Sequence, residues 1–212
     1  MPTADFLRDP MAFMRRNILE IGPGCNPWQP EAHGDKVLRF RIVPAGHRAV
    51  FPTGGLVYQL LPARVNDHPV IRAYFCPYTA EATCYTVLGT AASFMFTEMM
   101  DGCTFGIGSD GGDGTVRIGH ANYSIIGQKW DKVNQGPQRQ ASAQREVLKY
   151  NLGPDSTLIH PESYIDFNRP YHQVATVFGI LGDFRNWSFY AQKYIDNMVP
   201  CLLKSVDQYH HF

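Results

Sequence analysis

Apolar and polar side chains alternate along several stretches of the chain, and this alternation predicts β-strands. Successive side chains of a strand point to opposite faces, so a half-buried strand shows a period of two. Glycine, proline, asparagine and aspartate gather between these stretches, where turns require them. The expected strands are residues 37–43, 55–61, 70–76, 174–181 and 187–194, and residues 83–97 fit either a strand or a buried helix.

Two segments have a pattern typical of helices. Residues 10–20 carry apolar side chains at helical spacing, and Asp9 stands in the position of an N-terminal cap. Residues 141–150 also suit a helix, which Gly153 would end. Between these segments, residues 129–140 are polar, and we expect them to form a loop.

Together these elements predict one domain. A chain of 212 residues has the size of a single domain, and 44% hydrophobic residues are sufficient for its core. We expect a single catalytic domain over residues 1–212, with an N-terminal helix and an irregular segment, residues 1–30, packed on it. The expected fold class is α+β, with a mainly antiparallel β-sheet or two packed sheets forming a β-sandwich-like core, and helices around it.

Residues 101–122, DGCTFGIGSDGGDGTVRIGHAN, form the stretch around which the chain is organised. Two alternating runs, 103–108 and 115–120, flank the segment 109–114, which is rich in glycine and aspartate. Two alternating runs joined by such a segment predict an antiparallel hairpin.

The apolar positions of the two runs indicate how they pair. If Ile107 pairs with Val116, the apolar residues of both runs share one face and Cys103 lies opposite His120. The Cβ atoms of Cys103 and His120 would then lie about 4.5–5.5 Å apart, or roughly 7–8 Å if the register slips by two residues. In either register we expect the imidazole to reach the sulfur.

A cysteine beside a histidine indicates nucleophilic catalysis. A free thiol is mostly protonated at neutral pH, and a neighbouring imidazole can take its proton and hold the thiolate as an ion pair. Gly102 permits a tight turn before Cys103, and nearby backbone amides can stabilise an oxyanion. The alternative is that Cys103 is a small buried residue and His120 a residue at the rim of the core.

The segment from Gly102-Cys103-Thr104 to His120 resembles the core of the cysteine-dependent glutamine deamidases. This group includes the catalytic domains of the cytotoxic necrotizing factors, the Burkholderia lethal factor and, more distantly, the chemoreceptor deamidases. Toxins of the group typically carry Leu-Ser-Gly-Cys, whereas this chain has Met100-Asp101-Gly102-Cys103 and keeps only Gly-Cys. Total length is most similar to that of the stand-alone lethal-factor type.

The resemblance implies a hydrolase that converts a protein glutamine to glutamate and ammonia. Cys103 would be the nucleophile, and His120 would protonate the departing ammonia. The group orients its histidine through a third residue on a preceding loop, for which Thr97 is the first candidate and Asn122 the second. No cofactor is implied.

Composition and charge exclude several other classes. Nineteen basic residues balance nineteen acidic ones, without a basic run of the kind that binds nucleic acid. No apolar stretch approaches the roughly 20 residues that span a bilayer. The five cysteines are far apart, and neither a CxxC pair nor a zinc-type cluster occurs, which favours a reducing compartment and no metal site.

These observations fit a bacterial toxin or effector that is secreted without a classical signal peptide, or delivered, and acts in the host cytosol. We expect a monomer with no nucleic-acid or membrane partner. Its substrate would be a host regulatory protein, and the resemblance suggests a small GTPase or a translation-initiation helicase. Three alternatives remain: a cysteine peptidase or transglutaminase-like enzyme with the same pair, a non-enzymatic β-rich binding module, and a chemoreceptor deamidase with endogenous targets.

Overall fold

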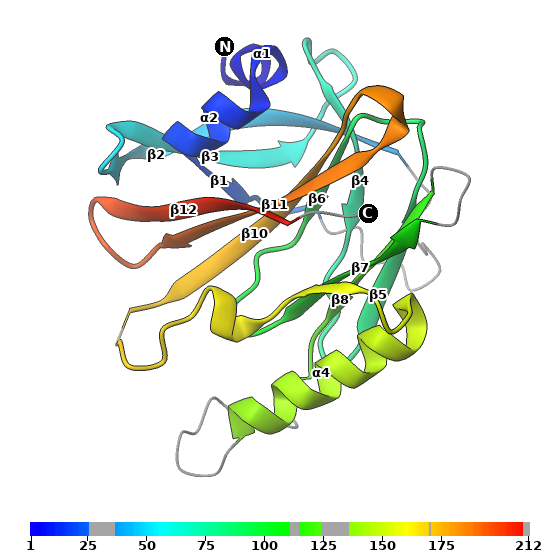
Figure 1. The fold of residues 1–212 in the computed structure, drawn as a ribbon. Helices are drawn as coiled ribbons and strands as arrows, with labels where there is room; N and C mark the ends of the chain where they lie inside the picture. The colour runs from blue at the N-terminus through cyan, green and yellow to red at the C-terminus, as the bar shows by residue number, and fades with distance from the viewer. Residues whose placement is uncertain (26–36, 111–114, 124–135, 170, 210–212) are drawn as a thin grey trace.

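A computed structural model describes residues 1–25, 37–110, 115–123, 136–169 and 171–209, and its strands form two sheets (Figure 1). The larger sheet contains β1 (Ile18–Ile21), β2 (Leu38–Phe51), β3 (Gly55–Pro62), β4 (Ile71–Cys76), β6 (Phe94–Thr97), β10 (Gln173–Leu181), β11 (Trp187–Ile195) and β12 (Cys201–Tyr209). The smaller sheet contains β5 (Thr83–Leu88), β7 (Thr104–Asp110), β8 (Val116–Ala121) and β9 (Thr157–Ile159). The strand orders are β1-β3-β2-β12-β11-β10-β6-β4 and β5-β8-β7-β9.

The long strand β2 closes the larger sheet into a barrel. It is 14 residues long and pairs antiparallel with β3 on one side. Near its start, Leu38 and Phe40 pair with β4, and near its end Val50 and Phe51 pair with β12. Because β12 and β4 are the two ends of the series β12-β11-β10-β6-β4, their pairing with one strand joins those ends.

The expectation of an α+β fold is therefore wrong. Of the described residues, 47% lie in strands and 20% in helices, and an eight-stranded sheet closed into a barrel, with a second sheet, takes the place of a sandwich surrounded by helices. Alternation shows which side chains share a face, but it does not show which strand edges meet. The closing pairs join β2 to segments distant in sequence, and no local pattern records that contact.

The strands expected at residues 37–43, 55–61, 70–76, 174–181 and 187–194 are confirmed as β2, β3, β4, β10 and β11. Residues 83–97, which fitted either a strand or a helix, form the two strands β5 and β6. The two strands belong to different sheets, so the segment between them links the smaller sheet to the barrel.

Two short helices precede the first strand. They are α1 (Pro2–Arg8) and α2 (Pro10–Arg16). The expected cap is confirmed, because the Asp9 carboxylate accepts a hydrogen bond of 2.9 Å from the Ala12 backbone N–H. The helix predicted at residues 10–20 is shorter than expected: α2 ends at Arg16, because the chain then becomes extended and enters β1. Of the irregular segment expected before residue 30, residues 26–30 lie outside the described residues.

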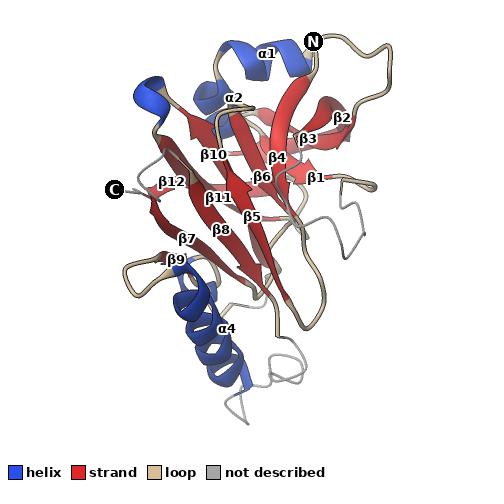
Figure 2. Cartoon of the chain, turned by 90° about the vertical axis from the view of Figure 1, so that its right-hand side faces the viewer, coloured by secondary structure: helices blue, strands red, loops and turns tan. Residues whose placement is uncertain are grey.

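The helix α4 (Gly136–Leu152) covers the outer face of the smaller sheet, at the end of the molecule away from α1 and α2 (Figure 2). It begins earlier than predicted, so the loop expected at 129–140 is wrong for 136–140, and 129–135 lie outside the described residues. Gly106 permits the close contact, because a Cβ there would lie 2.6 Å from a Leu152 methyl group. Two single-turn 3-10 helices, Pro161–Ser163 and Asp183–Arg185, complete the helical elements described.

Two main clusters of buried side chains hold these layers together. One lies between the sheets, where Phe105 and Ile118 of the smaller sheet pack with Val177 and Phe189 of the larger. The other lies between the barrel and the N-terminal helices, which contribute Phe6 among other aromatic side chains. The inner face of the hairpin β7–β8 is therefore part of the main core.

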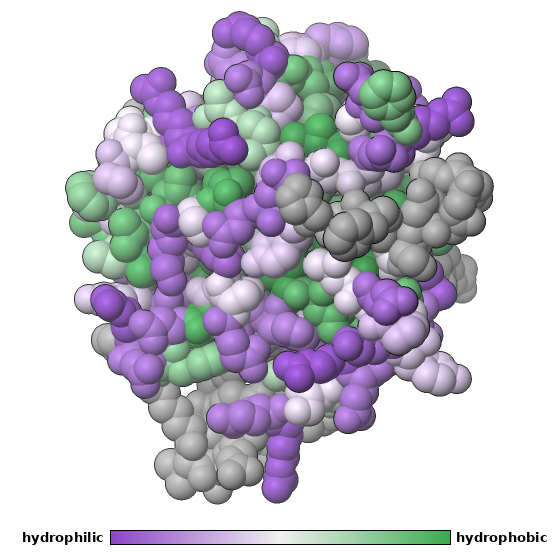
Figure 3. Space-filling view, viewed as in Figure 1, coloured by the Kyte–Doolittle hydropathy of each residue, from purple (hydrophilic) through white to green (hydrophobic). Residues whose placement is uncertain are grey.

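Hydrophilic side chains are spread over much of the surface seen in Figure 3, with smaller hydrophobic areas between them. In the described part of the chain, no helix combines the length and the apolar content that crossing a membrane requires.

Candidate active site

The hairpin predicted within residues 101–122 is confirmed, but its register is two residues away from the predicted one. Phe105 of β7, and not Cys103, lies opposite His120 of β8. Cys103 precedes Phe105 by two residues on the same face, so it is diagonal to His120, an arrangement for which Cβ atoms about 7–8 Å apart are typical. A slip of two residues leaves every side chain on its face, so alternation alone could not select between the two registers.

The loop end of the hairpin also differs from the prediction. β7 continues to Asp110, beyond the expected end at residue 108, and its pairing with β8 is irregular between Ile107 and Asp110. Of the loop expected at 109–114, residues 111–114 lie outside the described residues.

A second thiol lies beside His120. Cys84 of β5 is directly opposite His120 on the other edge of β8. Its sulfur is half-buried and donates a hydrogen bond of 3.2 Å to the Thr79 hydroxyl. Direct opposition places Cβ atoms closer than a diagonal does, so Cys84 competes with Cys103 as the partner of the imidazole. The pattern of the 101–122 segment alone could not reveal it.

The thiol of Cys103 is buried and hydrogen-bonded. Only 1% of the residue is exposed, and the Asn122 side-chain amide donates to its sulfur over 3.3 Å. Burial raises the pKa of the Cys103 thiol to about 12, and the hydrogen bond from Asn122 opposes part of that rise. The thiol is consequently neutral at pH 7.

The imidazole of His120 is equally buried, at 1% exposed, and burial lowers its pKa to about 4. Within the described residues, neither ring nitrogen has a hydrogen-bond partner. Leaving such a group unpaired costs about 1–3 kcal/mol, and an orphaned buried polar group in a native fold calls for an explanation such as catalysis. The pair is thus a neutral thiol and a neutral imidazole, and not the ion pair expected from the sequence.

The backbone just before Cys103 is held by side chains from two other segments. The Gly102 N–H donates to the Tyr164 hydroxyl over 3.0 Å, and that hydroxyl donates to the Cys103 carbonyl over 2.7 Å. The side-chain amides of Gln140 and Gln144, on α4, both donate to the Gly102 carbonyl over 3.1 Å. Gly102 has a φ of 133°, which a residue with a side chain rarely adopts.

Sequence reasoning missed Tyr164, Gln140 and Gln144. One signal was present for the glutamines: they stand four residues apart, in line with Leu148 and Leu152, and this stripe is the buried face of α4. Two amides on an otherwise apolar stripe indicate buried polar partners. No comparable local signal points to Tyr164, which follows a 3-10 helix far from the hairpin.

The two candidates for orienting His120 do not bind it. Thr97 ends β6 and is fully buried; its hydroxyl donates to the Glu98 carbonyl over 2.8 Å and accepts from the Val177 N–H over 3.3 Å. Asn122 binds the sulfur of Cys103, as described above. The structure therefore brings Asn122 to Cys103 and binds Thr97 to the backbone of the barrel.

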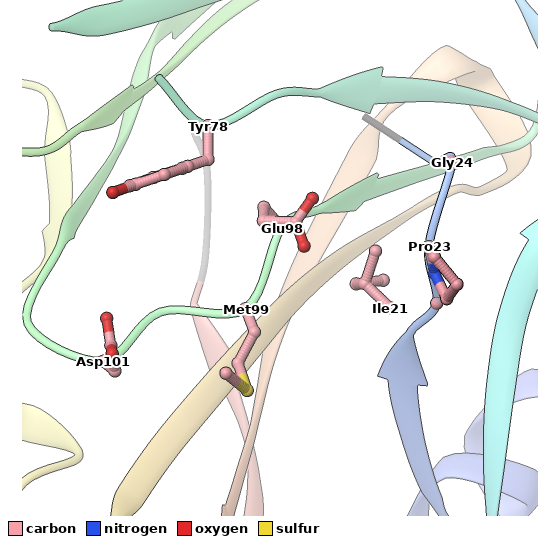
Figure 4. A pocket seen from close by; sticks show the side chains of 8 residues that line it. Ile21, Pro23, Gly24, Tyr78, Glu98, Met99 and Asp101 are labelled. Carbon is pink, nitrogen blue, oxygen red and sulfur yellow. The ribbon is translucent and has the colours of Figure 1, made fainter. Parts of the chain in front are cut away.

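A pocket of about 420 Å³, shown in Figure 4, is linked to Cys103 and His120 through two of its lining residues, Asp101 and Tyr78. Eight residues line it: Ile21, Gly22, Pro23, Gly24, Tyr78, Glu98, Met99 and Asp101. Asp101 is two residues before Cys103, and the Tyr78 ring centroid is 6.0 Å from that of His120. Tyr78 therefore forms part of the pocket wall and also contacts the buried imidazole.

Replacing Tyr164 with phenylalanine should lower the free energy of unfolding by about 1–3 kcal/mol, because the buried Gly102 N–H and Cys103 carbonyl both lose a partner. Urea denaturation measures the loss. Tyr150→Phe is the matched control, since that side chain is 89% exposed. Equal stability of Tyr164→Phe and wild type would contradict the bridging role.

Stability should also fall in mild acid because of His120. The unfolded chain protonates this residue near its ordinary pKa of 6.5, whereas the folded protein does so only near 4. Between these values the unfolded state binds more protons, so the free energy of unfolding decreases as the pH falls, by about 2 kcal/mol from pH 7 to pH 5. His120→Leu should remove this dependence in urea titrations, whereas replacing the exposed His68 with glutamine should retain it.

All five cysteines are free thiols, and within the described residues no group of three or more histidine, cysteine or acidic side chains has the arrangement of a metal site. A thiol, an imidazole and an amide are the reactive groups brought together at the base of the hairpin. Comparison with known proteins adds no family: no protein-family model matches the sequence, and neither does any curated protein sequence.

Proposed function

We propose that the protein is a cysteine-dependent protein glutamine deamidase. The observation that carries the proposal is the buried, unpaired imidazole of His120, on the same face of the hairpin as Cys103 and diagonal to it, with Asn122 bound to the sulfur. An imidazole without partners costs stability, and a role as proton acceptor and donor accounts for its retention.

The chemistry proceeds in two stages. The Cys103 sulfur attacks the carboxamide carbon of a substrate glutamine while His120 takes the thiol proton. The tetrahedral intermediate collapses, the C–N bond breaks, and His120 gives the proton to the departing ammonia. Water then attacks the resulting thioester with His120 as base, which releases glutamate and regenerates the thiol.

The neutral state of both side chains fits this sequence. A histidine with a lowered pKa is unprotonated at pH 7, and transfer of the thiol proton to it requires substrate binding to bring the pKa values of the two groups closer, because burial raises the pKa of the thiol to about 12. The amide of Asn122 stabilises negative charge as it develops on the sulfur. Proton transfer requires the sulfur and a ring nitrogen to come within hydrogen-bond distance; because neither ring nitrogen has a partner among the described residues, we propose a rearrangement of the two side chains on substrate binding.

Substrate entry is through the pocket beside Tyr78. Cys103 is almost fully buried, so a glutamine side chain must displace part of the wall, and Tyr78 is the lining residue that contacts His120. Movement of this half-buried ring would uncover the imidazole that it contacts. A glutamine side chain that projects from its backbone can use such an opening.

For the biological setting, the proposal follows the resemblance of the hairpin segment to the deamidase toxins. The protein acts as an effector in a host cytosol, on a regulatory protein such as a small GTPase or a translation-initiation helicase. Intact-mass spectrometry of host proteins treated with the protein should show a gain of about 1 Da on one target, with release of ammonia. Peptide-bond cleavage or incorporation of an amine in place of ammonia release would replace the proposal by a peptidase or a transglutaminase.

One observation favours a second candidate, a non-enzymatic binding module. The thiol of Cys103 has the burial and the raised pKa of a structural cysteine. Iodoacetamide labelling in the presence of substrate lysate separates the two functions. A deamidase requires Cys103 to become more reactive when substrate is present, whereas a binding module leaves its reactivity unchanged.

A further inference from the structure

The pocket beside Cys103 has a lining of mixed but specific chemistry. Ile21 and Met99 provide apolar surface, and Tyr78 provides an aromatic ring. Glu98 and Asp101 provide two carboxylates, and none of the eight lining residues is basic. Figure 4 shows the Glu98 side chain between Tyr78 and Ile21, with Met99 and Asp101 on the strand-to-turn segment below.

Glu98 is the most informative of these residues. Its side chain is half-buried, and burial raises the pKa of its carboxyl group. Among the described residues no lysine, arginine or histidine forms an ion pair with it. A carboxylate that has lost part of its hydration without gaining a cation is stabilised when a ligand supplies one.

Asp101 provides a second carboxylate, and it is closer to Cys103 in the sequence than Glu98 is. Its carboxylate is 55% exposed and lies 3.8 Å from the His172 ring, which also contacts Asp196 over 2.7 Å. His172 therefore stands between two carboxylates. Neither a lysine nor an arginine of the described residues forms an ion pair with Asp101.

We infer that this pocket binds the cationic side chain of a lysine or arginine that neighbours the target glutamine in the substrate. The apolar lining suits the aliphatic stem of such a side chain, and the carboxylates and the Tyr78 ring suit its charged end. A volume of 420 Å³ is within the range of small-molecule sites and accommodates one long side chain. An acidic side chain is excluded by the two carboxylates.

The link to glutamine rests on the proposed function, so binding is measured separately from turnover. Two peptides are used that contain one glutamine and differ only in the adjacent residue, lysine in one and the uncharged norleucine in the other. Their affinities are first determined for Cys103→Ala, which binds without reacting. The lysine peptide should bind about tenfold more tightly at low salt, and added salt should reduce the difference.

Glu98→Gln in the Cys103→Ala background should reduce this preference to about twofold or less. The control is Glu146→Gln, which makes the same change in net charge on the exposed face of α4 and should leave the tenfold preference intact. Equal affinity for both peptides, or an equal effect of both substitutions, would overturn the inference.

Turnover by the otherwise wild-type protein separates this inference from the proposed function. A preference for lysine in binding, without ammonia release from either peptide, would support the pocket and contradict the deamidase. Equal ammonia release from both peptides would support the deamidase and overturn the pocket. Added cadaverine tests the other source of an alkylammonium group: its incorporation into the product would overturn the assignment of the pocket to a substrate side chain.

Discussion

Replacing Cys103 with alanine should lower the rate of glutamine deamidation by roughly 10³-fold or more, because loss of a nucleophile removes the covalent route and leaves only binding and electrostatic contributions. The substitution is small and buried, so its cost in stability should remain about 1–3 kcal/mol. Ammonia release and the mass gain of the target protein measure the loss, and a urea titration confirms that the variant is folded.

The matched control for this experiment is Cys84→Ala. Cys84 lies directly opposite His120, whereas Cys103 is diagonal to it, so proximity along the ladder alone would select Cys84. The hydrogen bond from Asn122 and the turn held at Gly102 select Cys103. Activity retained by Cys103→Ala but lost by Cys84→Ala would assign the nucleophile to β5.

Replacing His120 with leucine should have two effects of opposite sign. Activity should fall by about 10²–10⁴-fold, the usual contribution of a general acid–base residue. The free energy of unfolding at pH 5 should rise, because an unpaired buried imidazole is replaced by an apolar side chain and the proton uptake of the unfolded state disappears.

The opposite signs separate a catalytic role from a structural one. If His120 only packed in the core, replacing it would lower the free energy of unfolding of the protein. Any loss of activity would then be a consequence of this lower stability. Stability is measured by urea titration at pH 5 and pH 7, and activity by ammonia release. A variant that is less stable than wild type at both pH values would contradict the role of His120 as an acid–base residue.

The sequence predicted those parts of the fold that depend on local pattern. Alternation identified the strands β2, β3, β4, β10 and β11, and the cap at Asp9 identified a helix start. Closure of the barrel depends on the two ends of β2, where Leu38 meets β4 and Val50 meets β12. These contacts join the two ends of a 14-residue strand to segments distant in sequence, which composition and period do not encode.

The site was predictable to the same extent. Alternation set Cys103 and His120 on one face of a hairpin, and the structure keeps them there. The predicted register, with Cys103 directly opposite His120, was wrong, because Phe105 takes that position. A shift of two residues leaves every side chain on its face, so alternation could not reveal it. The hydroxyl of Tyr164 reaches Gly102 from a distant segment, so only the three-dimensional structure reveals it.

The most direct test of the catalytic pair is to identify which cysteine reacts with a mimic of glutamine. In this peptide a diazomethyl ketone replaces the side-chain carboxamide of glutamine, and it alkylates a thiol that lies beside it. The sulfur bonds to the diazo carbon, that carbon takes up the thiol proton, and nitrogen gas leaves. Peptide mapping after labelling should find the adduct on Cys103 in wild type and in Cys84→Ala, and the labelling rate should fall by at least about 10²-fold in His120→Leu. An adduct on Cys84, or labelling of Cys103 at the same rate without His120, would contradict a Cys103–His120 deamidase.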